Sequence, residues 1–157
     1  MAQREIVNQY FDLIEERIEV KNKILQLQRQ IKEIEKRICE MREGEIVKDK
    51  VKGGLGGIQT FTIEGFPTKE YEMKMKELQK KKNLLENRQK MASELEIKIA
   101  EQIIEVEKFI ASIKDSHTRR IVELRVVNGL SWKEVAEEIG GGNTENGVKK
   151  IYSRLFE

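Results

Sequence analysis

The chain has 157 residues, of which 37% are charged and 6% aromatic, and its formal net charge at pH 7 is +2. So many charges beside so few aromatic side chains favour long solvated helices over one compact globule. The sequence has no apolar run near the roughly 20 residues that span a bilayer. Residues 1–9 lack the apolar region of a signal peptide, so we expect a cytoplasmic protein with no membrane partner.

A heptad pattern predicts a long helix over residues 3–42. Apolar residues recur there at alternating intervals of three and four, with Arg17 as the one interruption. Further apolar residues widen the stripe in the first half, which indicates contact with more than one neighbouring helix. The heptad residues are Ile6, Tyr10, Leu13, Val20, Ile24, Leu27, Ile31, Ile34, Ile38 and Met41, and the further ones are Val7, Phe11, Ile14, Ile18 and Leu25.

A glycine-rich connecting segment follows at about residues 44–67. Residues 53–57 are mostly glycine, and residues 59–64 alternate like a short strand. We expect a hinge or ordered loop, or a small hairpin that packs Phe61, Ile63 and Phe66. Phosphate binding by the glycine amides is an alternative that lacks the Gly-Lys-Ser/Thr continuation of a phosphate-binding loop. Contact of this basic loop with DNA is another.

A second long helix is predicted from Pro67 and Thr68 to Ile113. Its apolar stripe is Tyr71, Met75, Leu78, Leu85, Ala92, Ile99, Ile103, Val106, Ile110 and Ile113. At about 1.5 Å per residue the two helices have similar lengths, which favours an antiparallel hairpin over residues 1–114. A lone two-helix hairpin buries little apolar surface, so we expect a homo-oligomer formed through this coiled coil.

The remaining residues, 115–157, are predicted to contain short capped helices. Asp115 is placed to cap a helix over residues 116–128, which Gly129 ends. Ser131 and Glu134 have the spacing of a capping box. They start a second helix, on which Trp132 is the largest available core side chain.

Gly140 then permits the positive φ of a tight turn, and Thr144 caps a last helix that runs to Phe156. A short helix, a glycine turn and a second helix are the pattern of a helix-turn-helix. The last helix has an apolar side made by Val148, Ile151, Tyr152 and Leu155. Its other side carries amide, hydroxyl and cationic groups of the kind that contact base edges and phosphates, namely Asn146, Lys149, Lys150, Ser153 and Arg154. An exposed helix with merely solvated lysines is the alternative.

The stretch from Leu124 to Ala136 (LRVVNGLSWKEVA) resembles region four of bacterial sigma factors. It is closer still to phage and prophage regulators of the ArpU and RinA kind, in which a coiled-coil part precedes a sigma-like helix-turn-helix. The resemblance covers residues 115–157 and implies RNA polymerase as a further partner. It implies base contacts at Glu145, Asn146, Lys149 and Lys150. The whole predicted DNA-binding set is therefore Thr144, Glu145, Asn146, Lys149, Lys150, Ser153 and Arg154.

Two departures from the sigma pattern affect this helix. The turn between Gly140 and Thr144 is longer than the usual sigma turn. Gly147 stands where sigma factors often carry a basic residue, which lowers helix propensity and phosphate attraction.

The sequence offers little catalytic chemistry. His117 is the only histidine and Cys39 the only cysteine, which excludes a Ser-His-Asp triad, a histidine-rich metal site and an intrachain disulfide. We expect the thiol of Cys39 to be buried or half-buried. No enzymatic activity and no cofactor are predicted.

Together these patterns predict an all-α protein in which a long antiparallel helical hairpin precedes a small helix-turn-helix domain. The predicted function is sequence-specific binding of double-stranded DNA in the regulation of phage or prophage transcription. Two alternatives remain open. One is a DNA-packaging protein like a terminase small subunit, and the other is a coiled-coil scaffold that binds proteins.

Overall fold

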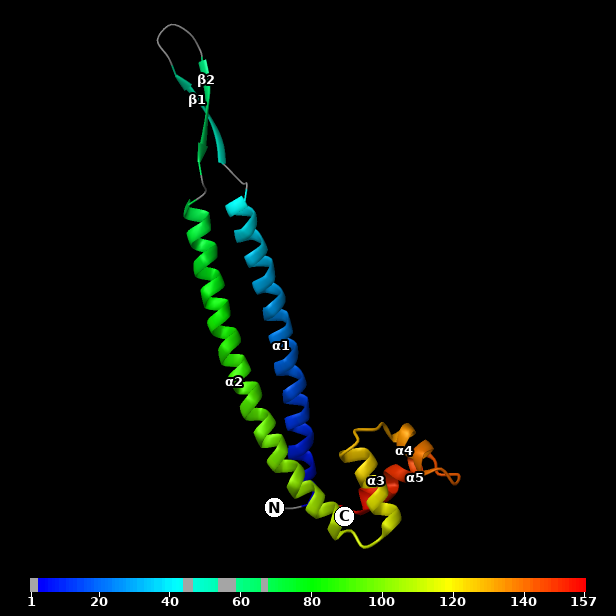
Figure 1. The fold of residues 1–157 in the computed structure, drawn as a ribbon. Helices are drawn as coiled ribbons and strands as arrows, with labels where there is room; N and C mark the ends of the chain where they lie inside the picture. Colours follow the sequence, from blue (N-terminus) through cyan, green and yellow to red (C-terminus); the bar gives the residue numbers. More distant parts are fainter. Residues whose placement is uncertain (1–2, 44–46, 54–58, 66–67) are drawn as a thin grey trace. The chain divides into compact units, whose positions relative to one another are not determined.

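Two long helices, a β-hairpin and three short helices make up the computed structural model, which describes residues 3–43, 47–53, 59–65 and 68–157 (Figure 1). For the two middle ranges it describes the backbone alone. The elements in chain order are α1 (Gln3–Glu43), β1 (Val47–Gly53), β2 (Gln59–Gly65), α2 (Thr68–Ser112), α3 (Ser116–Val126), α4 (Trp132–Ile139) and α5 (Glu145–Arg154). As predicted, α1 and α2 are long helices that pack together (Figure 1). Among the described residues, no helix has an apolar stretch long enough to cross a bilayer.

The segment between the long helices contains an antiparallel pair of strands. Val47 pairs with Gly65 at one end of the pair, and Gly53 pairs with Gln59 at the other. The strand predicted at residues 59–64 is therefore confirmed as β2. Its pairing with β1 is that of the small hairpin expected as one alternative for this segment, although the residues of β1 were not predicted. The packing predicted for Phe61, Ile63 and Phe66 lies outside what the structure describes.

The chain divides into two compact units, of which one comprises residues 20–91. Its core is a cluster of heptad residues from both long helices, with Tyr71 and Leu85 packed at its edge: Leu27, Ile31, Ile34, Ile38 and Leu78. Polar contacts join the helices beside this core. The Nζ of Lys82 lies 2.9 Å from Oε1 of Glu35, and Nη2 of Arg42 donates to the hydroxyl of Tyr71 at 2.6 Å.

The prediction that Cys39 is buried or half-buried is wrong. Its side chain is exposed, because the neighbouring Ile38 occupies the heptad position and is buried instead. A hydrogen bond with Glu43, together with the negative charge of that carboxylate, raises the pKa of the Cys39 thiol.

The other unit comprises residues 1–19 and 92–157. Its long-helix core again follows the heptads and adds Val7, Leu95 and Phe109: the buried residues are Val7, Tyr10, Leu95, Ile99, Val106, Phe109, Ile110 and Ile113. The wide apolar stripe of α1 contacts a further helix at Phe11, whose ring lies 5.7 Å from the guanidinium carbon of Arg125 in α3. That part of the prediction is confirmed. It is wrong for Ile18 and Leu25, since each is 52% exposed.

Within the same unit, α3, α4 and α5 pack around a small apolar core of their own. Ile121, Val135 and Val148 are fully buried, and the small side chain of Ala136 lets the helices approach closely. Six half-buried side chains pack against this cluster: Leu124, Leu130, Trp132, Ile139, Ile151 and Tyr152. The apolar side predicted for the last helix therefore packs against α3 and α4, through Val148, Ile151 and Tyr152.

Candidate nucleic-acid interface

Each of the three short helices begins at the residue predicted to cap it. Asp115 accepts a hydrogen bond from the backbone N–H of Thr118 at 2.8 Å. Ser131 and Glu134 form the reciprocal capping box, with the Ser131 backbone N–H donating to Oε2 of Glu134 at 2.7 Å. Thr144 accepts from the backbone N–H of Gly147 at 3.1 Å. Because such caps satisfy N–H groups that lack partners within the helix, the start of α5 is well defined.

The turn between α4 and α5 depends on three consecutive glycines. Gly140, Gly141 and Gly142 have φ angles of 67°, 64° and 77°, which side chains strongly disfavour. The side-chain amide of Asn143 donates to the carbonyl of Gly140 at 2.7 Å and closes the turn. This extended turn separates the end of α4 from the cap of α5.

Aromatic rings hold the carboxyl end of α5 against its surroundings. The Tyr152 ring packs edge to face against Trp132 with centroids 5.0 Å apart, and it packs in the same way against Phe156 at 5.0 Å. Phe156 also reaches Phe109 of α2, at 5.9 Å. Burial raises the pKa of Tyr152, against the opposing positive charge of nearby arginines. Aromatic pairs of this kind each add about 0.5 to 1.5 kcal/mol beyond their buried area.

Arg125 joins α3 to two other parts of this unit. Its guanidinium carbon lies 4.9 Å from the centre of the Trp132 ring and 5.7 Å from that of Phe11. Its Nη1 donates to the carbonyl of Leu130 at 2.7 Å. The sequence does not predict this role, because the spacing along the chain does not show that Phe11 is a neighbour of Arg125.

The outer face of α5 carries most of the residues predicted to contact DNA. Asn146, Lys150, Ser153 and Arg154 are all exposed. Thr144 is also exposed, although its hydroxyl is engaged as the helix cap. The outer face thus presents an amide, a hydroxyl and two cations, while the buried Val148 anchors the opposite side.

Lys149 and Glu145 are placed differently from the rest of the predicted set. The Nζ of Lys149 lies 2.6 Å from Oε1 of Glu145, one helical turn away, and the Lys149 side chain is 41% exposed. An exposed pair of this spacing is weak, about 0.3 to 0.5 kcal/mol, so a stronger ligand can separate it. Both side chains are therefore available to another partner at a small energetic cost.

Gly147, the departure from the sigma pattern, has a structural explanation in this fold. A Cβ atom added there would lie 3.2 Å from the Thr144 hydroxyl oxygen, the atom that caps α5. A larger residue would therefore crowd the cap. The glycine lowers helix propensity but leaves room for the threonine that begins the helix.

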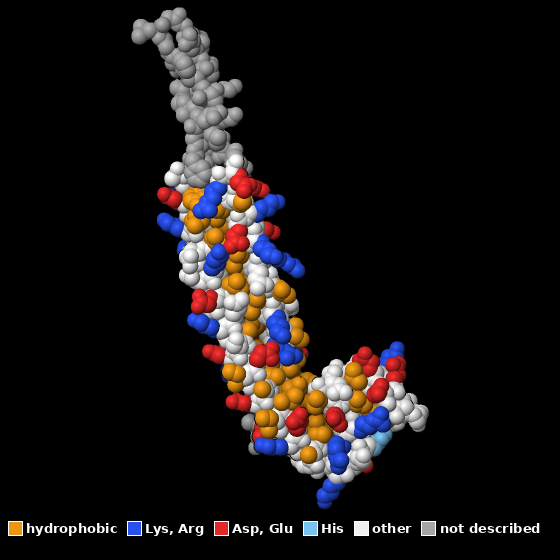
Figure 2. Space-filling model, in the orientation of Figure 1, with side chains coloured by type: hydrophobic (Ala, Val, Ile, Leu, Met, Phe, Trp, Pro, Cys, Tyr) orange, Lys and Arg blue, Asp and Glu red, His pale blue; other side chains and the backbone are white. Residues whose placement is uncertain are grey.

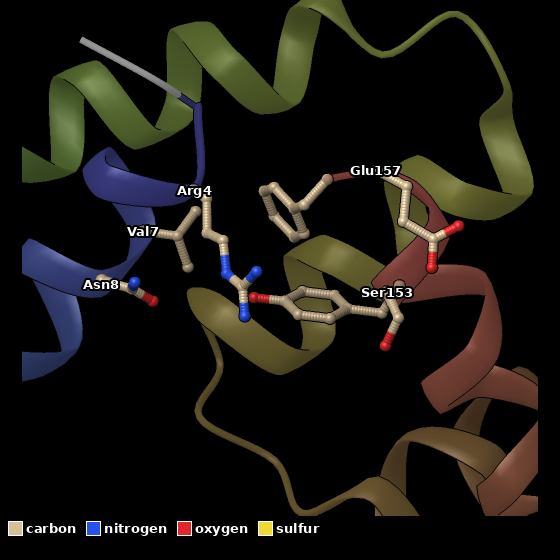
Figure 3. A pocket seen from close by; sticks show the side chains of 7 residues that line it. Arg4, Val7, Asn8, Ser153 and Glu157 are labelled. Atoms are coloured by element: carbon tan, nitrogen blue, oxygen red, sulfur yellow. The ribbon is translucent and has the colours of Figure 1, made fainter.

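A pocket of about 360 Å³ borders the carboxyl end of α5. Arg4, Val7 and Asn8 of α1 lie on one side of it and Ser153 and Glu157 on the other (Figure 3). Ser153 is therefore at the edge of the outer face, across this pocket from the first turns of α1 (Figure 3). No local sequence pattern indicates this neighbourhood, because the two segments lie at opposite ends of the chain.

Helices α3, α4 and α5 thus form a capped three-helix cluster, in which α5 has a polar and basic outer face. No family model, curated protein or solved structure matches this chain. Any proposal for a binding partner therefore depends on the side chains exposed on the outer face of α5.

Proposed function

We propose that α4 and α5 form a helix-turn-helix and that α5 enters the major groove of double-stranded DNA. The observation that supports this best is the division of α5 into two sides. Its apolar side is held in the three-helix core, while Asn146, Lys150, Ser153 and Arg154 remain exposed. We further propose that the protein is a sequence-specific transcription regulator of phage or prophage genes, as the sigma-like stretch implies.

The dimensions and the chemistry of α5 suit that groove. An α-helix with its side chains is about 10 to 12 Å across, and the major groove is about 12 Å wide. The 10 residues of α5 give it nearly three turns to present there. The amide of Asn146 can pair with an adenine edge, and Lys150 and Arg154 can contact guanine or phosphate. With Lys149 and Glu145 neutralising each other, Lys150 and Arg154 supply the positive charge of this face.

The first test combines selection of bound sequences from random duplexes with binding at several salt concentrations. Replacing Lys150 and Arg154 together by glutamine should weaken binding to the selected duplex. It should also reduce the salt slope by about 0.9 for each phosphate that the variant no longer neutralises. A matched control is the replacement of Lys76 and Lys80 of α2 by glutamine, because both are exposed and the change in net charge is the same. Equal binding by the two double variants would refute the role of α5.

The pair of Glu145 and Lys149 gives a second test of the same face. Glu145→Gln removes a carboxylate that repels phosphate and releases Lys149 from its 2.6 Å ion pair. We therefore expect tighter binding to non-specific DNA and a salt slope steeper by up to about 0.9, if Lys149 then meets a phosphate. Binding that weakens on random duplex would contradict this arrangement.

Two partners besides DNA are part of the proposal. We propose that the long helices mediate self-association, because exposed apolar side chains remain on them after α1 and α2 have packed. Contact with RNA polymerase is proposed on the sigma resemblance, and the cytoplasm is the compartment that this function requires. A closed ring of many subunits would instead favour the packaging protein. Failure to retain any duplex at low salt would favour the protein-binding scaffold.

A further inference from the structure

The pocket at the carboxyl end of α5 has polar side chains of α1 on its other wall. It holds about 360 Å³, and both of its walls belong to one compact unit. Arg4 and Asn8 are exposed residues in the first turns of α1, and Figure 3 shows both across the pocket from Ser153. Burial raises the pKa of the Tyr152 hydroxyl, and the positive charge of Arg4 is among those that oppose the rise. The guanidinium of Arg4 therefore lies near α5.

The donors of Arg4 and Asn8 are available to a ligand. Within the part of the chain that the structure describes, neither side chain forms a hydrogen bond or an ion pair, and the same holds for the Ser153 hydroxyl. A guanidinium presents several N–H donors in a planar fork that matches the oxygens of a phosphate group. Of the described residues that line the pocket, Glu157 is the only one with a negative charge. The pocket therefore offers a cation, an amide and hydroxyls to an anion, with one carboxylate opposing it.

The pocket continues the outer face of α5. At about 100° per residue, Asn146, Lys150 and Ser153 occupy an arc of roughly 60° around α5, and no other residue of the helix falls within that arc. Ser153 is the last of the three and also lines the pocket. In a helix-turn-helix complex, the amino-terminal residues of the second helix contact base edges. The carboxyl end of such a helix, about 10 Å further along its axis, lies near the phosphates that border the groove, which is about 12 Å wide.

We propose that Arg4 and Asn8 bind one phosphate of the DNA strand that borders the groove entered by α5. This contact rests on the proposed function of α5, and it adds the first turns of α1 to the DNA interface. Among the described residues on the face shown in Figure 2, cations of the C-terminal helices are mixed with carboxylates and form no broad basic patch. One well-placed guanidinium is therefore a substantial part of the positive charge that DNA meets. A phosphate contact adds affinity and fixes the position of α5, but it reads no base.

The first experiment measures binding of the full chain to its selected duplex at several salt concentrations. Arg4→Gln should reduce the salt slope by about 0.9, which weakens binding roughly 8-fold at 0.1 M salt when the two chains bind alike at 1 M. Arg4→Lys should keep the slope, since it keeps the charge. Lys98→Gln is the matched control, because Lys98 is exposed in the same compact unit and lines a different pocket. Equal binding by Arg4→Gln and Lys98→Gln would overturn the proposal.

The second experiment locates the phosphate. Ethylation of the DNA phosphates, followed by separation of bound from free duplex, should reveal one interfering position that disappears in Arg4→Gln. A duplex with an uncharged methylphosphonate at that position should bind the natural chain about as weakly as the natural duplex binds Arg4→Gln. Combining the two changes should weaken binding by less than about a further twofold, because both remove the same contact. Additive weakening would overturn the proposal.

Two neighbours of Arg4 give further readouts. Asn8→Ala should weaken binding about 2- to 10-fold at an unchanged salt slope, because the amide that it removes is neutral. Glu157→Gln should tighten binding, since it removes the carboxylate that opposes the phosphate. Weaker binding by Glu157→Gln would contradict an anion in this pocket. Circular dichroism checks that helix content is unchanged in every variant.

The outcomes separate this contact from the proposed function. Weaker binding in the double variant of Lys150 and Arg154, with Arg4→Gln indistinguishable from Lys98→Gln, overturns the contact and leaves the function of α5. A natural chain that retains no duplex at low salt refutes both. Inorganic phosphate that binds the free chain through Arg4, together with DNA binding that Arg4→Gln does not change, would assign the pocket to a free anion and overturn the contact with DNA.

Discussion

Replacing Arg125 by alanine should destabilise the C-terminal helices by about 2 to 4 kcal/mol. The guanidinium donates to the Leu130 carbonyl at 2.7 Å, and a hydrogen bond from a charged group contributes about 1.5 to 3 kcal/mol. The rings of Trp132 and Phe11, at 4.9 and 5.7 Å, add about 0.5 to 1 kcal/mol each. Because Arg125 is only half-buried, water replaces part of these interactions in the variant, so the expected loss is below their full sum.

Urea unfolding followed by tryptophan fluorescence measures this loss directly. Trp132 is the only tryptophan and lies against the guanidinium, so its emission reports on this site. Arg125→Lys keeps the charge but loses the planar group that stacks between rings, and it should recover less than half of the lost stability.

Arg120→Ala is the matched control on the same helix. Arg120 is exposed and makes one long hydrogen bond, 3.3 Å to the carbonyl of Glu138, so its loss should cost no more than about 0.5 kcal/mol. Equal free energies of unfolding for Arg125→Ala and Arg120→Ala would refute the importance assigned to the stacked guanidinium.

Three further predictions concern the caps and the turn. Ser131→Ala removes the cap of α4 and should lower the free energy of unfolding by about 1 kcal/mol, measured in urea. Hydrogen bonds from Thr118 and Ser131 lower the pKa values of the Asp115 and Glu134 carboxyls from their ordinary 3.8 and 4.5. Because the lowered pKa values belong to the folded state, these carboxylates stabilise the fold above their ordinary pKa values, and the stabilisation is lost as pH falls through the lowered ones. Thermal unfolding over a series of acidic pH values should therefore show a flatter decline for the Asp115→Asn, Glu134→Gln double variant than for the natural chain. Gly140→Ala should cost about 1 to 3 kcal/mol from backbone strain alone, since φ 67° and ψ −155° are a glycine conformation and the nearest atom to an added Cβ lies 4.0 Å away. An unchanged urea midpoint in that variant would contradict the strain.

The long helices were predictable because heptad spacing is a local property of the sequence. Leu27, Ile31 and Ile34 are buried as their spacing requires. Heptad spacing does not predict exposure where the burial of a side chain depends on which residues the neighbouring helix places against it. Cys39 is exposed because Ile38 occupies the buried heptad position, and Ile18 is exposed although it was predicted to widen the apolar stripe.

The candidate interface was predictable where its determinants lie within one helical turn. The cap at Thr144 and the inward side of Val148 follow from spacing alone. The pairing of Glu145 with Lys149 is also a one-turn relation, although both residues were predicted to contact bases. By contrast, the stacking of Arg125 on Phe11 joins residues more than a hundred positions apart, and no local pattern contains it.

The three glycines before α5 have a consequence for how this protein can vary. Gly140, Gly141 and Gly142 all have a backbone conformation that a side chain penalises, so substitution is costly at each of them. Loss or gain of one glycine keeps the turn's composition and changes its length. Related sequences should therefore differ at this turn by insertion or deletion of glycines and not by substitution. Each such change would alter the direction of α5 relative to α4 and leave the residues of α5 unchanged.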